Sequence, residues 1–386
     1  MYETAPFSIH LTTGTLLMKI RLVFLFFLFT HLTTYGQELV RTFYDEEKRI
    51  VREVYRKVNG VAEGEYKLFY EEGSLAVLGQ LSNDKKEGLF IDFFPNSQDT
   101  LRIIHYENNL KQGPSRNFYQ SGEISQELHY VDDQLEGEVI SYFESGITRQ
   151  KATFKNNRPD GWTYDYNPEG NLLEKAFYKD GLLDGVREQY YEDGQLRAST
   201  TYKKGDIQGE QLNYYPSGKL KSKFSYKKGY QHGPTISYYE DGSVARKGKY
   251  RRGDPHGEFV SYHENGQVAE QAKYKRGDPV GDITSYYPDG SIQEVASYND
   301  FGNIQKLIAF YPNGEKEREV YYRNGQEEGT AVKYFENGQI KETMPFVKGS
   351  PHGTQMVYNE NGKLILERQF KEGRKIGEIL KEEINN

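Results

Sequence analysis

Cysteine is absent from this chain of 386 residues, so disulfides, thiolate metal sites and a thiol-linked lipid anchor are all excluded. No apolar run reaches the roughly 20 residues that a membrane-spanning helix needs. Proline is scarce beside glycine, with 13 copies against 39. The net charge of -7 lacks the basic excess that a nucleic-acid groove requires. These absences argue against a disulfide scaffold, a stable membrane span and a nucleic-acid partner.

Aromatic residues are what the chain has in abundance, with 33 tyrosines and 21 phenylalanines. A mean hydropathy of -0.84 would suggest disorder in a chain poor in aromatics. Here the aromatic residues recur at fixed positions. The polarity therefore indicates a thin structure with much surface for each residue.

The N-terminal region has the composition of a secretory signal peptide. Lys19 and Arg21 precede the apolar run LVFLFFLF of residues 22–29, and small residues come before Gln37. We interpret residues 1–17 as an upstream mis-start, residues 18–36 as the signal peptide and residues 37–386 as one repeat array. An uncleaved membrane anchor is the alternative. The protein is then exported to the periplasm, the cell envelope or the extracellular space.

A 24-residue period organises the rest of the chain, and such a period is typical of a repeat architecture. One step is 25 residues long, with its extra residue in the turn at 95–100, and a degenerate unit opens at Gln305. The other units each open on a glycine: Gly64, Gly88, Gly113, Gly137, Gly161, Gly185, Gly209, Gly233, Gly257, Gly281, Gly329, Gly353 and Gly377. Below, positions in a unit are counted from this opening residue as position 0.

Two turns recur in every unit. Position 20 is Gly, Asn or Asp, which tolerate positive φ, so we expect one left-handed residue there in each unit. Phe301 breaks this rule beside Gly302, which predicts a turn shifted by one residue. Position 9 is usually glycine in a sequence such as Pro-Ser-Gly-Lys or Glu-Asp-Gly-Gln, which has hairpin-turn composition. We expect the acids beside it to satisfy backbone amides of the turn.

Between the turns, residues alternate with a period of two, which predicts strands. Positions 3 and 5 share one face, and we expect positions 11, 15 and 17 to share a face of the next strand. Position 13 is often charged, which we attribute to a bulge or a hollow. The prediction is an all-β, elongated, twisted antiparallel meander of about 27 strands in 13–14 hairpin repeats. A parallel β-solenoid is the rival topology.

The segment YYEDGQL at 190–196, followed by YKKGDIQG at 202–209, resembles the MORN repeat variant, and its copies YYPSGKL, YYEDGSV, YHENGQV and YFENGQI do so too. The resemblance covers nearly all of residues 41–386. It implies an elongated antiparallel sheet that associates with proteins and sometimes lipids. Bacterial chains with this variant are often named as toxin–antitoxin components.

No phosphate loop, HExxH or GxSxG pattern is present, so we predict no catalytic, cofactor or metal residues. His232 and His256 share a column, and we interpret them as turn residues. Position 6 follows the buried aromatic at position 5 and points to the opposite face. Its tyrosines form a candidate binding ridge or, alternatively, cover the turns: Tyr191, Tyr215, Tyr239 and Tyr287.

The sequence favours an exported, non-enzymatic scaffold that binds a protein partner. The alternatives are a cytoplasmic antitoxin and a cell-wall glycan-binding module. Self-association is also expected, because a strand array exposes a strand edge at each end.

Overall fold

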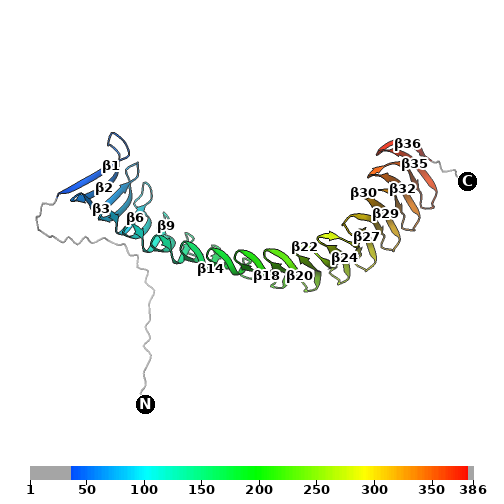
Figure 1. Ribbon diagram of the computed structural model, residues 1–386, viewed down its shortest axis with the longest axis horizontal. Helices are drawn as coiled ribbons and strands as arrows, with labels where there is room; N and C mark the ends of the chain where they lie inside the picture. Colours follow the sequence, from blue (N-terminus) through cyan, green and yellow to red (C-terminus); the bar gives the residue numbers. More distant parts are fainter. Residues whose placement is uncertain (1–35, 381–386) are drawn as a thin grey trace, which may run out of the picture.

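The computed structural model describes residues 36–380, and all of their regular structure is β-strand. The predicted mis-start and nearly all of the predicted signal peptide lie outside these residues. Figure 1 shows one elongated, bowed ribbon whose strands lie across its long axis, with β1 (Gln37–Phe43) near one end and β36 (Arg374–Leu380) at the other. The 36 strands form a single sheet that stays open.

The longer strands of the N-terminal half each cover six to nine residues. They are β2 (Val51–Val58), β3 (Val61–Phe69), β4 (Leu75–Ser82), β6 (Gly88–Phe93), β7 (Thr100–Glu107), β9 (Gly113–Phe118), β10 (Ile124–Val131), β12 (Gly137–Tyr142), β13 (Thr148–Lys155), β14 (Arg158–Tyr166), β15 (Leu172–Lys179), β16 (Leu182–Tyr190), β17 (Leu196–Lys203) and β18 (Asp206–Tyr214).

The C-terminal half continues in the same way. Its longer strands before β36 are β19 (Leu220–Lys227), β20 (Tyr230–Tyr238), β21 (Val244–Arg251), β23 (Gly257–Tyr262), β24 (Val268–Lys275), β26 (Gly281–Tyr286), β27 (Ile292–Tyr298), β28 (Ile304–Phe310), β29 (Lys316–Arg323), β31 (Gly329–Tyr334), β32 (Ile340–Val347), β34 (Gly353–Tyr358) and β35 (Leu364–Lys371). Two-residue strands precede some of the opening glycines: β5 (Lys85–Lys86), β8 (Leu110–Lys111), β11 (Gln134–Leu135), β22 (Asp254–Pro255), β25 (Asp278–Pro279), β30 (Gln326–Glu327) and β33 (Ser350–Pro351).

Consecutive strands pair antiparallel along the whole ribbon. β18 pairs with β19 through Gly209↔Tyr226, and β19 pairs with β20 through Ser222↔Ser237. The predicted meander of hairpins is therefore confirmed, and the parallel solenoid is wrong. The strand total is higher than the predicted 27 because a bulge near the opening glycine splits several strands in two.

The turn at position 20 contains two left-handed residues, one more than expected. Lys228 has φ 53° and Gly229 has φ 78°, and the preceding unit has the same pair at Lys204 and Gly205. Positive φ at both central residues is the type I′ geometry, whose twist matches that of the flanking strands. The sequence prediction included the glycine and missed its neighbour, although seven units have Asn or Asp there, which tolerate positive φ.

The turn at position 9 is a longer one. The amide of Tyr191 donates to the carbonyl of Gln195, and the amide of Gly194, with φ 84°, donates to the carbonyl of Tyr191. The carboxylate of Asp193 accepts the amide hydrogen of Gln195 at 2.9 Å, as expected for an acid that satisfies the turn. At the degenerate unit the positive φ falls on Gly302 instead of Phe301, which confirms the shifted turn.

The buried core lies on one face of the sheet and consists mainly of two columns of residues, positions 2 and 15. Position 2 lies opposite position 15, as in Phe259↔Ala272, and these two side chains are 3% and 5% exposed. The Phe259 ring meets Tyr250 and Tyr274 edge-on, with ring centroids 5.4 and 5.3 Å apart. Each unit thus buries little apolar surface on its own, and much of the stability comes from contacts between neighbouring units.

The predicted grouping of positions 11, 15 and 17 is right for positions 15 and 17 and wrong for position 11. Val244 at position 11 lies opposite Tyr238 at position 5, whereas Gly248 at position 15 lies opposite Thr235 at position 2. A register shift after Ser237 inserts one residue into the second strand and moves position 11 to the other face. This bulge is the one suspected from the charged residues at position 13.

Candidate binding surface

The four ridge tyrosines lie in one row along a turn edge of the ribbon, and each is half-buried. Each phenol donates a hydrogen bond to the backbone carbonyl of the position-5 residue in the following unit: Tyr191 to Tyr214 at 2.8 Å, Tyr215 to Tyr238 at 2.8 Å, Tyr239 to Tyr262 at 2.6 Å and Tyr287 to Phe310 at 2.9 Å. The row therefore joins neighbouring units, and its role in binding stays a prediction.

A histidine can take the same place in this row. The Nε2 atom of His263 lies 2.8 Å from the carbonyl oxygen of Tyr286, where seven other units have a phenol. The contact needs a side chain of a given length ending in a polar atom. This explains why position 6 is polar and aromatic in most units.

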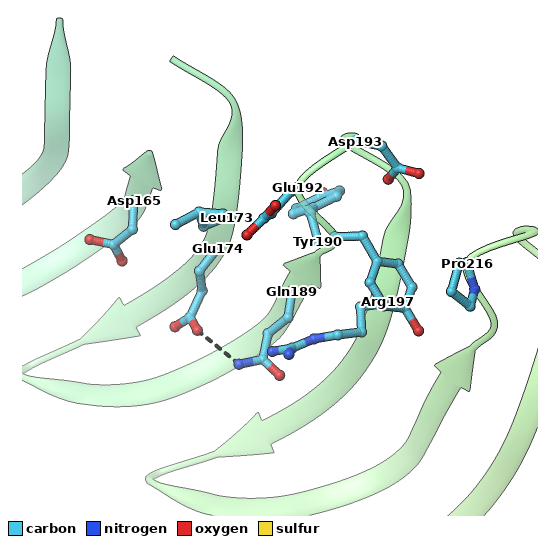
Figure 2. A pocket seen from close by; sticks show the side chains of 10 residues that line it. Asp165, Leu173, Glu174, Gln189, Tyr190, Glu192, Asp193, Arg197 and Pro216 are labelled. Carbon is cyan, nitrogen blue, oxygen red and sulfur yellow. Dashed lines mark hydrogen bonds between the residues drawn. The ribbon is translucent and has the colours of Figure 1, made fainter. Parts of the chain in front are cut away.

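A concavity of about 860 Å³ lies beside Tyr191, between β14 and β17. In Figure 2, Glu174 and Gln189 are joined by a hydrogen bond, with Glu192 and Asp193 at the turn above them. The lining residues are Asp165, Leu173, Glu174, Gln189, Tyr190, Tyr191, Glu192, Asp193, Arg197 and Pro216. Four carboxylates and one guanidinium give this surface a negative charge.

Three hydrogen bonds hold the carboxylate of Glu174 in place in this concavity. This carboxylate accepts two hydrogen bonds from Arg187, at 2.8 and 2.6 Å, and one from Gln189 at 3.1 Å. Burial acts to raise the pKa of Glu174, but these hydrogen bonds outweigh it and hold the pKa below its ordinary value. The group is therefore ionised at neutral pH, and its charge is paired with that of Arg187.

Sequence reasoning missed these acids, although one signal was available. Glu174 stands at position 13, the charged column for which the sequence offered only a bulge or a hollow. The structure places that column next to the rim of the concavity, where Asp165 also accepts a hydrogen bond from Gln150 at 2.7 Å. A charge recurring on a buried-face position was the clue.

The interpretation of the histidine column as turn residues is wrong, because His232 lies within β20 and His256 directly follows β22. The amide of His256 donates to the carbonyl of Lys249 at 2.9 Å, next to the bulge at the opening glycine. Within residues 36–380, no group of three or more potential metal ligands comes together. The same residues include no helix long and apolar enough to cross a membrane.

The profile of the MORN repeat variant matches ten segments that together cover more than half of the chain: residues 62–83, 111–132, 135–156, 183–204, 207–228, 231–252, 255–276, 279–300, 327–348 and 351–372. The chain belongs to the MORN repeat variant family. Each MORN match ends on the first left-handed residue of a type I′ turn or on its counterpart, as at Lys228. The unmatched stretches fold alike, since β6–β7, β14–β15 and β28–β29 are the same hairpin.

Solved structures add little to the MORN assignment. A TcdB2-TccC3-Cdc42 structure is 10% identical over 88% of this chain with a TM-score of 0.15, and the Photorhabdus luminescens Tc holotoxin pore is 9% identical over 86% with 0.16. The chain spans 23% of the length of each. A porin-like protein from Bacteroides uniformis is 15% identical, covering 66% of this chain and 92% of its own, with a TM-score of 0.13. Among curated proteins, none matches the chain.

Proposed function

We propose that this protein is an exported, non-enzymatic scaffold that binds a protein partner on the acidic concavity beside Tyr191. The proposal rests on four carboxylates that line a hollow with an aromatic border. Arg197 is the one cation of this lining, and Arg187 pairs with one of the four acids, Glu174. Aromatic rings are enriched at protein-binding surfaces, whose rim is polar. A basic segment of a partner, with an apolar side chain to cover Leu173, fits this surface.

The repeat supports a scaffold rather than an enzyme. Units built alike supply carboxylates in like environments, whereas acid–base catalysis needs two that differ. Beyond the concavity, the rings of Tyr215 and Tyr239 continue the same edge and extend the surface available to a long partner.

The partner site is tested by neutralising its acids. We expect the variant Asp165→Asn/Glu192→Gln to capture fewer partners from a cell-envelope extract. The reason is that the two neutral amides no longer attract the basic segment of a partner. Quantitative mass spectrometry of the captured proteins is the measurement. The control Glu240→Gln/Asp282→Asn removes the same charge from other exposed positions. The site is wrong if both variants retain, or both lose, the same proteins.

Export is tested separately, by the N-terminus of the mature chain. Expressed with its full sequence in a bacterium, the chain should be found outside the cytoplasm and begin at Gln37 by N-terminal sequencing. A soluble cytoplasmic chain that still carries residues 18–36 would contradict export and favour the antitoxin alternative.

A further inference from the structure

The turn edge opposite the ridge tyrosines carries a row of cations, which we name the basic edge. Four consecutive type I′ turns each have two basic residues side by side: Lys203-Lys204, Lys227-Lys228, Arg251-Arg252 and Lys275-Arg276. All eight side chains are exposed. In the part of the chain that the structure describes, Lys203 alone among them forms an ion pair, with Asp184 at 2.8 Å.

The basic edge has a regular spacing. Each unit contributes two strands, and strands lie about 4.8 Å apart, so the pairs recur about every 10 Å over about 30 Å. Four carboxylates also lie near the edge: Asp184, which pairs with Lys203, and Asp206, Asp254 and Asp278. The cations still outnumber them in a chain whose net charge is -7.

Turn geometry does not require these cations. Lys204, Lys228, Arg252 and Arg276 all have left-handed backbones, with φ between 52° and 57°. Seven of the other nine type I′ turns have Asn or Asp at this place: Asn59, Asn83, Asn108, Asp132, Asn156, Asp180 and Asn324. Asn and Asp adopt this conformation readily, whereas other residues are disfavoured by about 1 kcal/mol. The four cations therefore stand where the fold alone favours asparagine.

The surface around the basic edge is hollowed. A concavity of about 540 Å³ between two of the turns is lined by Arg251, Arg252, Asp254, His256, Lys275 and Arg276. A second one, of about 660 Å³, continues onto the sheet, where Lys247, Lys249 and Lys273 surround the apolar Ile236 and Val260. Glu258 is the only acid of that second lining.

One aromatic ring stands within the row. Tyr230 is 62% exposed, and it lies against Gly253, between the second and third basic pairs. An exposed ring among cations offers a flat apolar surface to the C–H face of a sugar. Single-stranded nucleic acids instead need a series of rings on which successive bases stack.

We propose that the basic edge binds a linear anionic polysaccharide, one that carries sulfate, phosphate or carboxylate groups. A polyanion holds condensed counterions, and cations without partners release them on binding, which drives association. An isolated acidic side chain of a protein holds no condensed counterions, so its binding releases none. This site is distinct from the acidic concavity beside Tyr191, so either proposal can fail without the other.

The test measures binding of a heparin-derived oligosaccharide, a sulfated linear glycan, to the full chain by calorimetry. The variant Lys204→Asn/Lys228→Asn/Arg252→Asn/Arg276→Asn installs the residue that the turns favour. Its Kd should rise by about tenfold or more near 0.1 M salt, and the slope of log K against log salt should fall by about 3. Its melting temperature should stay the same or increase, which separates lost binding from lost folding.

The control variant is Arg149→Gln/Lys219→Gln/Lys341→Gln/Lys363→Gln, which removes four exposed cations from the other edge. Its affinity should change by less than about twofold at the same salt. Equal weakening of both variants, or no binding of the oligosaccharide to the unaltered chain, overturns the proposal. Tighter binding of a single-stranded oligonucleotide of equal charge, lost in the first variant, would assign the edge to nucleic acid and contradict it too.

Discussion

Valine in place of Gly248 should lower the free energy of unfolding around β21 and β23 by about 3 kcal/mol. A Cβ at this position would overlap the ring of Phe259, which is 3% exposed and held between Tyr250 and Tyr274. The backbone of Gly248 does not have positive φ, so the loss comes from the ring and not from the turn of the chain. Hydrogen exchange of the amides of these two strands, together with urea unfolding, is the measurement.

A double-mutant cycle isolates the cause. Phe259→Ala alone should cost about 3–4 kcal/mol through the cavity that it leaves. In that background Gly248→Val should cost less than about 1 kcal/mol, because the ring is gone. An equal cost of the valine with and without the ring would show that the close approach of Gly248 and Phe259 does not limit packing.

Protonation of Glu319 should lower the free energy of unfolding at acidic pH. This carboxylate, 8% exposed, accepts hydrogen bonds from Lys306 at 2.6 Å, Lys316 at 2.8 Å and Tyr321 at 2.7 Å. Burial acts to raise its pKa, but the three donors outweigh burial and lower the pKa to about 2, against 4.5 for a free glutamate. Because the folded pKa is the lower one, the stabilisation of about 2–3 kcal/mol is complete above pH 4.5 and is lost as the pH falls towards 2.

The measurement is the free energy of unfolding as a function of pH for the native chain and for Glu319→Gln. We expect the variant to be less stable at pH 7, since two lysines are left beside a neutral amide, and to lose less stability between pH 4.5 and 2. Glu317→Gln, an exposed change in the same strand, should keep the native pH profile. A Glu319→Gln profile parallel to the native one would show that this carboxylate does not supply the acid sensitivity.

The hairpins could be predicted from the sequence because their signals are local. Gly229 and Gly194 mark turns by their own chemistry, and the repeat shows each turn many times over. The core could not be found in this way. Phe259 shares its column with Thr163 and Gln355, so burial there leaves no constant residue type to recognise. The bulge before Arg246 exchanges the two faces, and the charge at position 13 suggested a bulge or a hollow without showing this exchange.

The candidate sites, too, could be predicted from the sequence only in part. Tyr191 could be singled out from its column, but its carbonyl partner, Tyr214, lies 23 residues away and depends on how units stack. The acidic concavity depends on curvature, which a pattern of residue types does not encode. The basic pairs could be read from the sequence, but only the structure shows that their turns lie along one edge of the sheet.

The hydrogen bond from a position-6 tyrosine to the next unit, made in seven units, has a mechanical consequence. Because strands lie across the long axis, tension applied to the two ends would peel strand pairs apart one at a time rather than shear them all together. Each released unit would add 24 residues of slack, on the order of 80 Å when fully extended. The ribbon would then lengthen in steps of equal length, with a higher force threshold at the units that have the phenol–carbonyl contact.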